Sequence, residues 1–331
     1  MKFELVVNGL DNAFIKEFGC DCERCTRQAR AANTSISLLV FEDSGSLEKH
    51  VLFDVGSGIT DSLLENTALA LQPRLDWIVL SHWHSDHTQE LVRLTTGWVR
   101  SQTRLGFEPE PVPVWRRSGS ATWIKHLYPH LRASQLELRA SNETESVGVL
   151  LEPVPLNIEG LRVTPVTTSH FTADFDTLGN FQPCCSGFVL ETAEFKVVLL
   201  WDLDATNLWL SNPAPHQIPT LELLRGADHV FMDCNTWAYD HNAAGQPASH
   251  VSFSMVKEFA RSLEPKNTWL VHLSGHEDQV GSGFGWDDTR WELEAQKAWR
   301  LEQLPGVVRV PRIGEVIQFR EMELSLDMSF D

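Results

Sequence analysis

The sequence is poor in positive charge and has no long apolar run. Its 331 residues include 27 Lys and Arg against 45 Asp and Glu, a formal net charge of −18. A negative field of this size repels the phosphate backbone of nucleic acids, so we expect no nucleic-acid partner. The apolar run at residues 1–9 is too short for a signal peptide, and no stretch approaches a membrane span. We therefore expect a cytoplasmic protein without membrane contact.

Cysteines are too few and too unevenly spaced for the disulfide framework of a secreted domain. Three of the six crowd together as Cys20, Cys22 and Cys25. Clustered thiols in a chain of this size are typical of a metal site rather than of disulfides. These three residues are therefore predicted metal ligands.

Hydrophobic patterning predicts short strands alternating with helices. Helices are expected at 61–72, closed by Pro73, and at 252–263. Such an α/β (α+β) pattern fits two sheets packed face to face with helices outside, a four-layer αββα sandwich. We predict one domain over residues 1–331 and interpret residues 101–160 as an insertion with loops over the site. The expected strands, of which the first three would be antiparallel, lie at 3–7, 35–41, 51–55, 77–80, 162–166, 187–190, 196–200, 229–232, 269–271 and 307–310.

A histidine-rich motif directly follows the strand predicted at 77–80. Residues 82–87 read His-Trp-His-Ser-Asp-His. Alternate residues of an extended chain face the same way, so His82 and His84 can bind one ion while Asp86 and His87 turn toward a second. So many polar side chains are hard to explain by packing alone, because buried imidazoles need partners. The motif predicts a two-metal site.

The motif, with Asp54 in Phe-Asp-Val-Gly upstream, resembles the metallo-β-lactamase superfamily. This resemblance implies a metallo-β-lactamase sandwich and three further ligands, each after a predicted strand: His170, Asp202 and His272. Asp204 is the alternative to Asp202 as the bridging carboxylate. Asp54 is interpreted as a residue that orients a ligand. The implied active-site cofactors are two Zn²⁺ ions, or Mn²⁺ or Fe²⁺, one held by His82, His84 and His170, the other by Asp86, His87 and His272, with Asp202 between them.

Residues 18–25, Phe-Gly-Cys-Asp-Cys-Glu-Arg-Cys, resemble the cyclic-phosphate phosphodiesterases of bacterial phosphonate breakdown. In that family a histidine beyond the last active-site histidine joins the cysteines around a structural zinc. His276 matches it here, four residues after His272 rather than three. The resemblance implies a structural Zn²⁺ held by Cys20, Cys22, Cys25 and His276. Residues 233–237 and the later His250 also resemble the pyrroloquinoline-quinone biosynthesis protein B.

The phosphodiesterase resemblance gives His250 the role of general acid. Asp233, at the end of a predicted strand, would hold the imidazole protonated and oriented. The alternative is that His250 caps the helix predicted at 252–263. We predict a two-metal hydrolase that cleaves a small, cyclic phosphodiester by attack of a metal-bridging hydroxide, with Asp86, His250 and Asp233 as catalytic residues. Two cations between carboxylates leave a slightly positive pocket, which suits a small anionic substrate.

Other functions stay open at this point. An acyl hydrolase, such as a lactonase or thioesterase, could use the same metals without His250. A binding or accessory protein of the quinone-biosynthesis type could hold a ligand without cleaving it. Processing of tRNA 3′ ends conflicts with the net charge of −18. A homodimer is expected from base rates. Trp83 and Trp237 are the candidate substrate contacts among the tryptophans.

Overall fold

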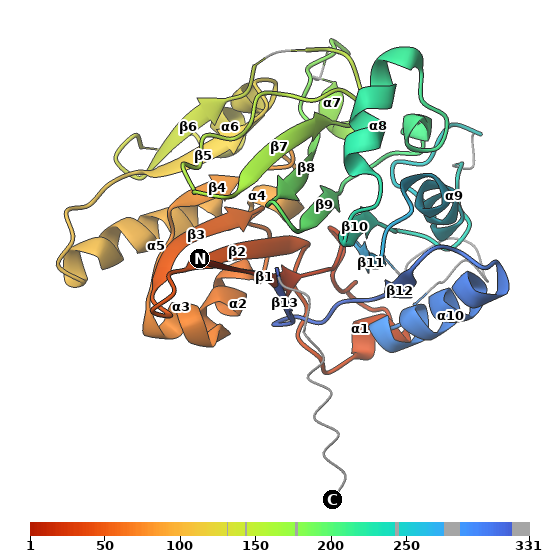
Figure 1. The fold of residues 1–331 in the computed structure, drawn as a ribbon. Helices are drawn as coiled ribbons and strands as arrows, with labels where there is room; N and C mark the ends of the chain where they lie inside the picture. The colour runs from red at the N-terminus through yellow and green to blue at the C-terminus, as the bar shows by residue number, and fades with distance from the viewer. Residues whose placement is uncertain (131, 143, 176–177, 242–244, 275–284, 320–331) are drawn as a thin grey trace, which may run out of the picture.

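The computed structural model describes residues 1–130, 132–142, 144–175, 178–241, 245–274 and 285–319. Two mixed β-sheets face each other and helices lie on their outer sides (Figure 1). This arrangement confirms the predicted four-layer αββα sandwich. Within the described ranges, no helix is both long enough and apolar enough to span a membrane.

The first sheet begins antiparallel, as predicted, and continues parallel. β13, β1, β2 and β3 pair antiparallel, whereas β3, β4, β5 and β6 pair parallel. The parallel part directs the carboxyl ends of its strands toward one edge. Across the sheet the strands are β13 (Val316–Gln318), β1 (Lys2–Gly9), β2 (Ser35–Phe41), β3 (Leu47–Phe53), β4 (Trp77–Val79), β5 (Val112–Arg116) and β6 (Leu136–Ala140).

The second sheet directs most of its strands the same way. β9, β10, β11 and β12 are parallel, and β7 shares their direction because it is antiparallel to β8, which is antiparallel to β9. The carboxyl ends of β7, β9, β10 and β11 therefore lie at one edge. Across the sheet the strands are β12 (Val307–Arg309), β11 (Asn267–Val271), β10 (His229–Asp233), β9 (Lys196–Leu200), β8 (Ser186–Glu191) and β7 (Arg162–Thr167).

The helix predicted at 61–72 is divided into two. The Asn66 backbone is extended and its side chain accepts the N–H of Leu69, which ends one helix and starts the next. The helix predicted at 252–263 forms with Ser252 as its cap, because the Ser252 hydroxyl accepts the N–H of Met255. The helices are α1 (Glu23–Thr26), α2 (Ile59–Glu65), α3 (Thr67–Leu71), α4 (Ser85–Thr88), α5 (Leu91–Arg104), α6 (Ser120–Leu127), α7 (Phe171–Asp174), α8 (Ile218–Leu224), α9 (Phe253–Leu263) and α10 (Asp288–Leu301), with 3₁₀ turns at Leu208–Leu210 and Pro215–Gln217.

Side chains of both sheets form a shared core. Leu38 and Phe53 from the first sheet and Phe188 and Leu199 from the second belong to one buried cluster. The Phe53 and Phe188 rings lie 5.4 Å apart between the sheets. Burying one such side chain stabilises the fold by about 2–3 kcal/mol. This core fixes the sheets against each other, and with them the edge at which the strand ends meet.

Residues 101–160 differ from the loops expected there. They contain β5 and β6, which extend the parallel part of the first sheet, and the helix α6. Pro113 makes the β5 segment look like a loop in the sequence, but the neighbouring strand β4 provides a parallel partner. The segment is thus largely part of the sandwich. Its interpretation as an insertion, like the single-domain assignment, stays a prediction.

Candidate metal centre

The ends of five strands deliver the polar residues of one site. Asp54 directly follows β3, and His82 comes three residues after β4. In the second sheet, His170, Asp202 and His272 follow β7, β9 and β11 within three residues. Because these strands run in one direction, their carboxyl ends place the side chains at the same edge. The sandwich thereby joins residues that are far apart in the sequence.

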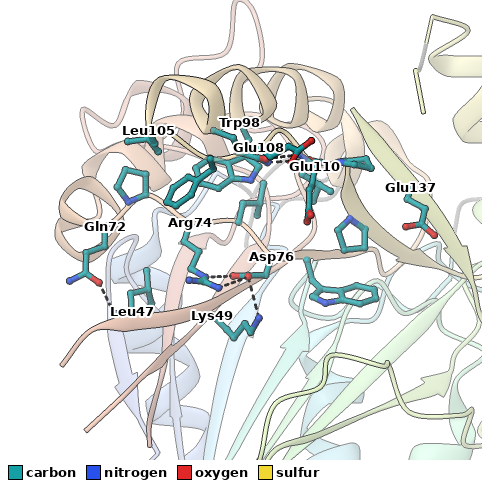
Figure 2. Close-up of a pocket in the computed structure, with 18 of the residues that line it drawn as sticks. Leu47, Lys49, Gln72, Arg74, Asp76, Trp98, Leu105, Glu108, Glu110 and Glu137 are labelled. Carbon is teal, nitrogen blue, oxygen red and sulfur yellow. Dashed lines mark hydrogen bonds and ion pairs between the residues drawn. The ribbon is translucent and has the colours of Figure 1, made fainter. Parts of the chain in front are cut away.

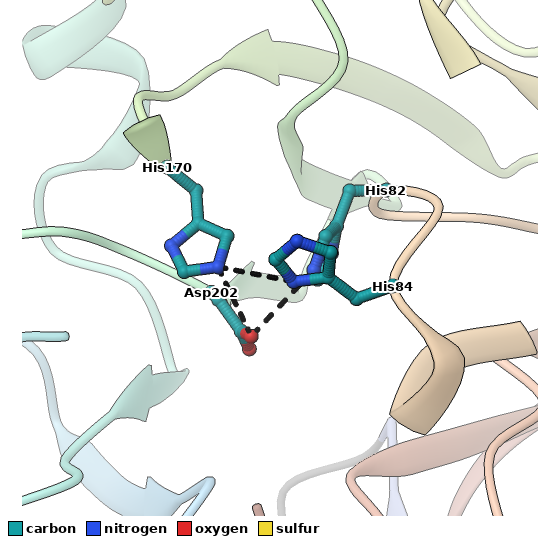
Figure 3. A group of neighbouring side chains, drawn as sticks. All are labelled: His82, His84, His170 and Asp202. Carbon is teal, nitrogen blue, oxygen red and sulfur yellow. Dashed lines mark hydrogen bonds and ion pairs between the residues drawn. The ribbon is translucent and has the colours of Figure 1, made fainter. Parts of the chain in front are cut away.

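The first predicted ligand set gathers as expected. His82, His84, His170 and Asp202 place one potential ligand atom each within 4.8 Å of one another. Figure 3 shows the three imidazoles around the Asp202 carboxylate. Nε2 of His82 and Nε2 of His170 lie 3.7 and 3.9 Å from Oδ2 of Asp202, and Nε2 of His170 lies 3.3 Å from Nδ1 of His84. This geometry allows one ion to contact all four side chains.

The second predicted set lies on the other side of Asp202. It consists of Asp86, His87, Asp202 and His272, which also place one potential ligand atom each within 4.8 Å of one another. Oδ2 of Asp86 lies 3.3 Å from Nε2 of His87 and 3.2 Å from Nε2 of His272. Asp202 is therefore shared between the two sets. Asp204 is not, because its Oδ2 accepts the backbone N–H of Phe171 and the carboxylate is occupied in holding the turn after His170.

The carboxylate of Asp54 orients His87 of the second ligand set from the side of the ring that faces away from Asp86 and Asp202. It accepts hydrogen bonds from Nδ1 of His87 at 2.8 Å, from N and Oγ of Ser81 at 2.7 Å each, and from Nε1 of Trp201 at 2.7 Å. The bond from Nδ1 leaves Nε2 of His87 facing Asp86 and Asp202, as a metal ligand requires. Asp54 and His272 both have left-handed backbones, with φ of 61° and 58°. Such strain in non-glycine residues collects at functional sites.

Comparison with known proteins identifies the superfamily of the chain. A family model described as a beta-lactamase superfamily domain matches residues 49–273, more than half of the chain. The chain belongs to this superfamily. Its members with the metallo-β-lactamase fold are generally metal-dependent hydrolases, which the His and Asp clusters fit. No curated protein matches the chain.

Several solved structures share the superfamily fold. A diphosphatase from the PhnP family is 19% identical with a TM-score of 0.62, covering 96% of this chain and 98% of its own. Zn²⁺-bound PqqB from Methylobacterium extorquens is 14% identical, also with a TM-score of 0.62, covering 95% and 99%. The short form of human tRNase Z is 14% identical with a TM-score of 0.60, covering 96% and 100%. Identities this low show the fold alone.

The first ligand set is in the chemical form that binds a metal. Burial, together with the neighbouring His87 and His84 imidazoles, lowers the pKa of His82 well below its usual value. Burial likewise lowers the pKa values of His84 and His170. Neutral imidazoles are metal ligands. Nε2 of His82 and Oδ1 of Asp202 are buried without a hydrogen-bond partner in the part of the chain that the structure describes. Such unpaired buried atoms fit a divalent ion.

The second set attracts positive charge. Burial would raise the pKa values of Asp86 and Asp202, but the adjacent His87 and His272 outweigh it and lower both well below the usual value. At His87, burial lowers the pKa, yet Asp202, Asp86 and Asp54 outweigh it and raise the pKa well above normal. Asp86 and Asp202 both face Nε2 of His87, while Asp54 accepts from its Nδ1. Two carboxylates beside one nitrogen favour a cation there, whether a proton or a metal. The superfamily fold and these clusters together imply divalent metal ions.

His250 and Asp233 form a pair beside both sets. Nδ1 of His250 donates to Oδ2 of Asp233 at 2.9 Å, and the His250 ring lies 4.9 Å from that of His170 and 4.7 Å from that of His272. Burial lowers the pKa of His250, but Asp233 outweighs it and raises the pKa to about 9. A third group of possible ligands joins Asp202, Asp233, His250 and His272. His250 does not cap α9, since Ser252 does.

The three clustered cysteines also come together. One Sγ atom each of Cys20, Cys22 and Cys25 falls within 4.8 Å of the others. Their segment is fixed to α10, because the buried Arg24 side chain donates to Asp11 and Asp288. His276, the fourth predicted ligand, lies outside the described residues. A structural zinc at the thiols therefore stays a proposal.

Sequence reasoning missed two contacts that shape the site. Trp201, directly before Asp202, reaches Asp54 of the other sheet, and Nε1 of Trp83 donates to the carbonyl of Ala173 at 2.8 Å. The motif places Trp83 between two ligands, but only the fold shows which backbone its indole holds.

A large cavity lies away from this chemistry. It measures about 930 Å³ and opens at the amino ends of β3 to β6, the edge opposite the metal centre. Figure 2 shows Arg74 and Lys49 directed at Asp76 within it, and these ion pairs are 2.8 and 3.5 Å long. Its charged side chains are thus partly neutralised by one another. No predicted site residue lines it.

Proposed function

We propose that the chain is a phosphodiesterase that cleaves a small cyclic phosphodiester at the metal centre. The observation that carries the proposal is the pair of His250 and Asp233, with the His250 ring within 5 Å of the rings of His170 and His272. Departure of an alkoxide from phosphorus demands a proton, because the alkoxide is strongly basic. A histidine oriented by a carboxylate beside the ligands is suited to supply that proton.

Each residue has a distinct task in this scheme. His82, His84, His170, Asp86, His87, Asp202 and His272 would hold two divalent ions, zinc being the metal that imidazole and carboxylate ligands commonly bind. When bound, the ions would supply an activated water and neutralise charge on the phosphate. Nδ1 of His250 is held by Asp233, so its Nε2 is the atom that protonates the leaving oxygen. Asp54 keeps His87 turned toward its neighbours.

Two structural relatives support a phosphoester substrate. One is a diphosphatase and another is a tRNase Z. A small anion is favoured over RNA for this chain because the net charge of −18 opposes polyanions. The imidazole of His250 keeps some exposure, with 19% of its side chain open to solvent, whereas that of His82 has none. A substrate can therefore reach His250 from outside.

The test separates proton donation from metal binding. His250→Asn removes the acid, and His126→Asn, an exposed histidine on α6, is the matched control. Zinc- and manganese-loaded proteins would be assayed with bis(p-nitrophenyl) phosphate, with a five-membered cyclic phosphodiester, and with a p-nitrophenyl ester and a lactone. We expect His250→Asn to lower turnover of the cyclic ester about 10²- to 10⁴-fold. The loss with p-nitrophenolate should be smaller because that leaving group needs no proton.

Metal content decides between the two roles of His250. If His250 is the acid, the His250→Asn protein binds as much metal as wild type and His126→Asn behaves as wild type in every assay. A loss of bound metal would instead make His250 a ligand within the third group. Cleavage of the ester or lactone alone would replace the proposal by an acyl hydrolase, and metal-loaded protein inert on all four substrates would favour a ligand-binding role.

We also propose a structural zinc at Cys20, Cys22 and Cys25, completed by His276. Three thiolates and an imidazole make a closed tetrahedral site. Cys22→Ser should release about one zinc per chain and lower the melting temperature, while phosphodiester turnover per remaining metal stays near the wild-type value. Unchanged zinc content in Cys22→Ser would contradict the thiol site.

A further inference from the structure

Exposed apolar side chains flank the metal centre on the His170 side. Phe175, Leu178 and Phe181 have 43%, 85% and 37% of their surface exposed. Phe175 and Phe181 face each other across an antiparallel bridge, with ring centroids 5.5 Å apart. We call these three residues the apolar rim. Exposure of large apolar groups to water is unfavourable, and where they gather they mark a binding surface.

The rim is anchored directly to the candidate ligands. The backbone N–H of His170 donates to Oδ2 of Asp174 at 2.9 Å, and the N–H of Cys184 donates to Oδ1 at 2.9 Å. The same aspartate thus joins His170 to the returning chain beyond Phe181. Nε2 of His84 lies 3.3 Å from the carbonyl oxygen of Thr172. These contacts hold the base of the rim against two ligands, so the rim lies beside the site and not elsewhere on the surface.

Stacked indoles support the base of the rim. The rings of Trp83 and Trp123 are 4.3 Å apart and nearly parallel, at 10°. Trp83 meets His84 edge-on at 4.6 Å and donates to the carbonyl of Ala173, two residues before Phe175. Trp123 lies on α6, so the 101–160 segment contributes to this side of the site. Packed aromatic rings make a stiff support.

The chemistry of the rim indicates the kind of group that it contacts. Residues 170–185 include no Lys or Arg, so the segment offers no cation to a second phosphate or to a nucleic-acid backbone. Among the described residues of this segment, the exposed side chains are two phenyl rings and an isobutyl group, together with the uncharged Thr172 and Asn180. Such a surface gains most from an apolar or aromatic group that leaves water on binding.

We propose that the apolar rim binds an apolar, preferentially aromatic, organic group of the phosphoester whose phosphate lies at the metal centre. This inference rests on the proposed function and adds the substrate class. The phosphate contacts the ligand cluster, while the organic group lies against Phe175, Leu178 and Phe181. The rim thereby sets which phosphoesters are preferred, without touching the reacting atoms.

The test compares two ligands with one headgroup. Methylphosphonate and phenylphosphonate would be titrated calorimetrically into metal-loaded protein. In wild type we expect phenylphosphonate to bind at least about tenfold more tightly, the scale on which apolar pockets discriminate. In Phe175→Ser and Phe181→Ser the ratio of the two dissociation constants should fall to about threefold or less. Leu178→Ser is a third rim variant, should either ring substitution fail to fold.

Phe107→Ser is the matched control. Phe107 is also an exposed phenylalanine, at 60%, but it lines the cavity at the opposite edge. The tenfold ratio should persist in this variant. A ratio near one in wild type, or an equal ratio in rim and control variants, would overturn the inference. Phosphodiester turnover measured on the same samples keeps the two proposals apart: turnover without a phenyl preference contradicts the rim alone, and a phenyl preference without turnover contradicts the reaction alone.

Discussion

Replacement of Asp54 by asparagine tests whether one buried carboxylate maintains the metal centre. The Asp54 side chain accepts four hydrogen bonds, and three of them, from Ser81 Oγ, His87 Nδ1 and Trp201 Nε1, end on Oδ2. The fourth, from the Ser81 N–H, ends on Oδ1. Asparagine has the same size but offers one acceptor oxygen and one NH₂ group. It can satisfy the three donors or the one, but not all four.

The magnitude follows from the count of unpaired donors. The amide oxygen of the variant is expected at the position of Oδ2, which leaves the new NH₂ group against the Ser81 N–H. Each buried donor without an acceptor costs about 1–3 kcal/mol, and two donors, the Ser81 N–H and the new NH₂, are left unpaired, so we expect the free energy of unfolding to fall by about 2–6 kcal/mol. His87 also loses a charge-assisted bond, and weakening such support of a ligand lowers metal affinity about 10- to 100-fold.

Two measurements check these numbers. Urea unfolding of metal-free protein gives the stability change, and chelator competition gives zinc affinity, in a Cys22→Ser background that removes the thiol site. Asp76→Asn is the matched control, since Asp76 precedes β4 and accepts from Arg74 at 2.8 Å, at the edge away from the metal centre. The control should keep wild-type zinc affinity. If Asp54→Asn binds zinc as tightly as wild type, His87 is positioned by other contacts and the reasoning is wrong.

Three further predictions concern stability. Chelation of the metal should lower the melting temperature. Ions that bind only the folded chain stabilise it by about 2.7 kcal/mol when the free ion is at a hundredfold excess over Kd. An unchanged calorimetric transition after chelation would contradict the metal centre. Burial lowers the pKa of His50 to about 4, below the unfolded value near 6.5, so the unfolded chain binds more protons and the free energy of unfolding should fall by about 2 kcal/mol between pH 8 and pH 5. His50→Asn should lack that part of the pH dependence when the free energy of unfolding is measured by urea titration at each pH. If the variant and the wild type show the same change between pH 8 and pH 5, His50 is not its source. Arg24→Met removes a buried partner of Asp11 and Asp288 and should cost about 3 kcal/mol, whereas the exposed Arg290→Met should cost less than about 0.5 kcal/mol in the same assay.

Local patterns sufficed for the parts of the fold that depend on neighbours in the chain. The β2 and β9 ranges agree with the predicted 35–41 and 196–200, because both are short segments rich in apolar residues between turns. The residue types and spacing of the motif at 82–87 likewise suffice to predict metal ligands. β5 and β6 were not predicted, since their short segments gain strand structure from β4 and from each other. Tertiary pairing outweighs weak local preference there.

The shared carboxylate shows where the sequence leaves a choice. Asp202 and Asp204 stand two residues apart after the same strand, so alternation gives both the same orientation. Both residues lie beyond the end of β9, so tertiary contacts, and not strand alternation, distinguish Asp202 from Asp204. Asp204 is occupied by the backbone N–H of Phe171, which places Asp202 alone of the two within both ligand sets. Only the packing of the turn after His170 against the end of β9 decides the choice.

The contacts of Asp54 couple the packing of the two sheets to the geometry of the metal centre. The sequence allows the expectation that it orients a ligand, but it gives no sign of the bond from Trp201, which lies 147 positions away. Asp54 directly follows a strand of the first sheet and Trp201 directly follows a strand of the second, just before the shared Asp202. The indole N–H therefore links the two sheets at the same carboxylate that orients His87. Any change that alters the spacing of the sheets must also move Asp202 relative to His87, so loosening of the distant core should appear as weaker metal binding before it appears as unfolding.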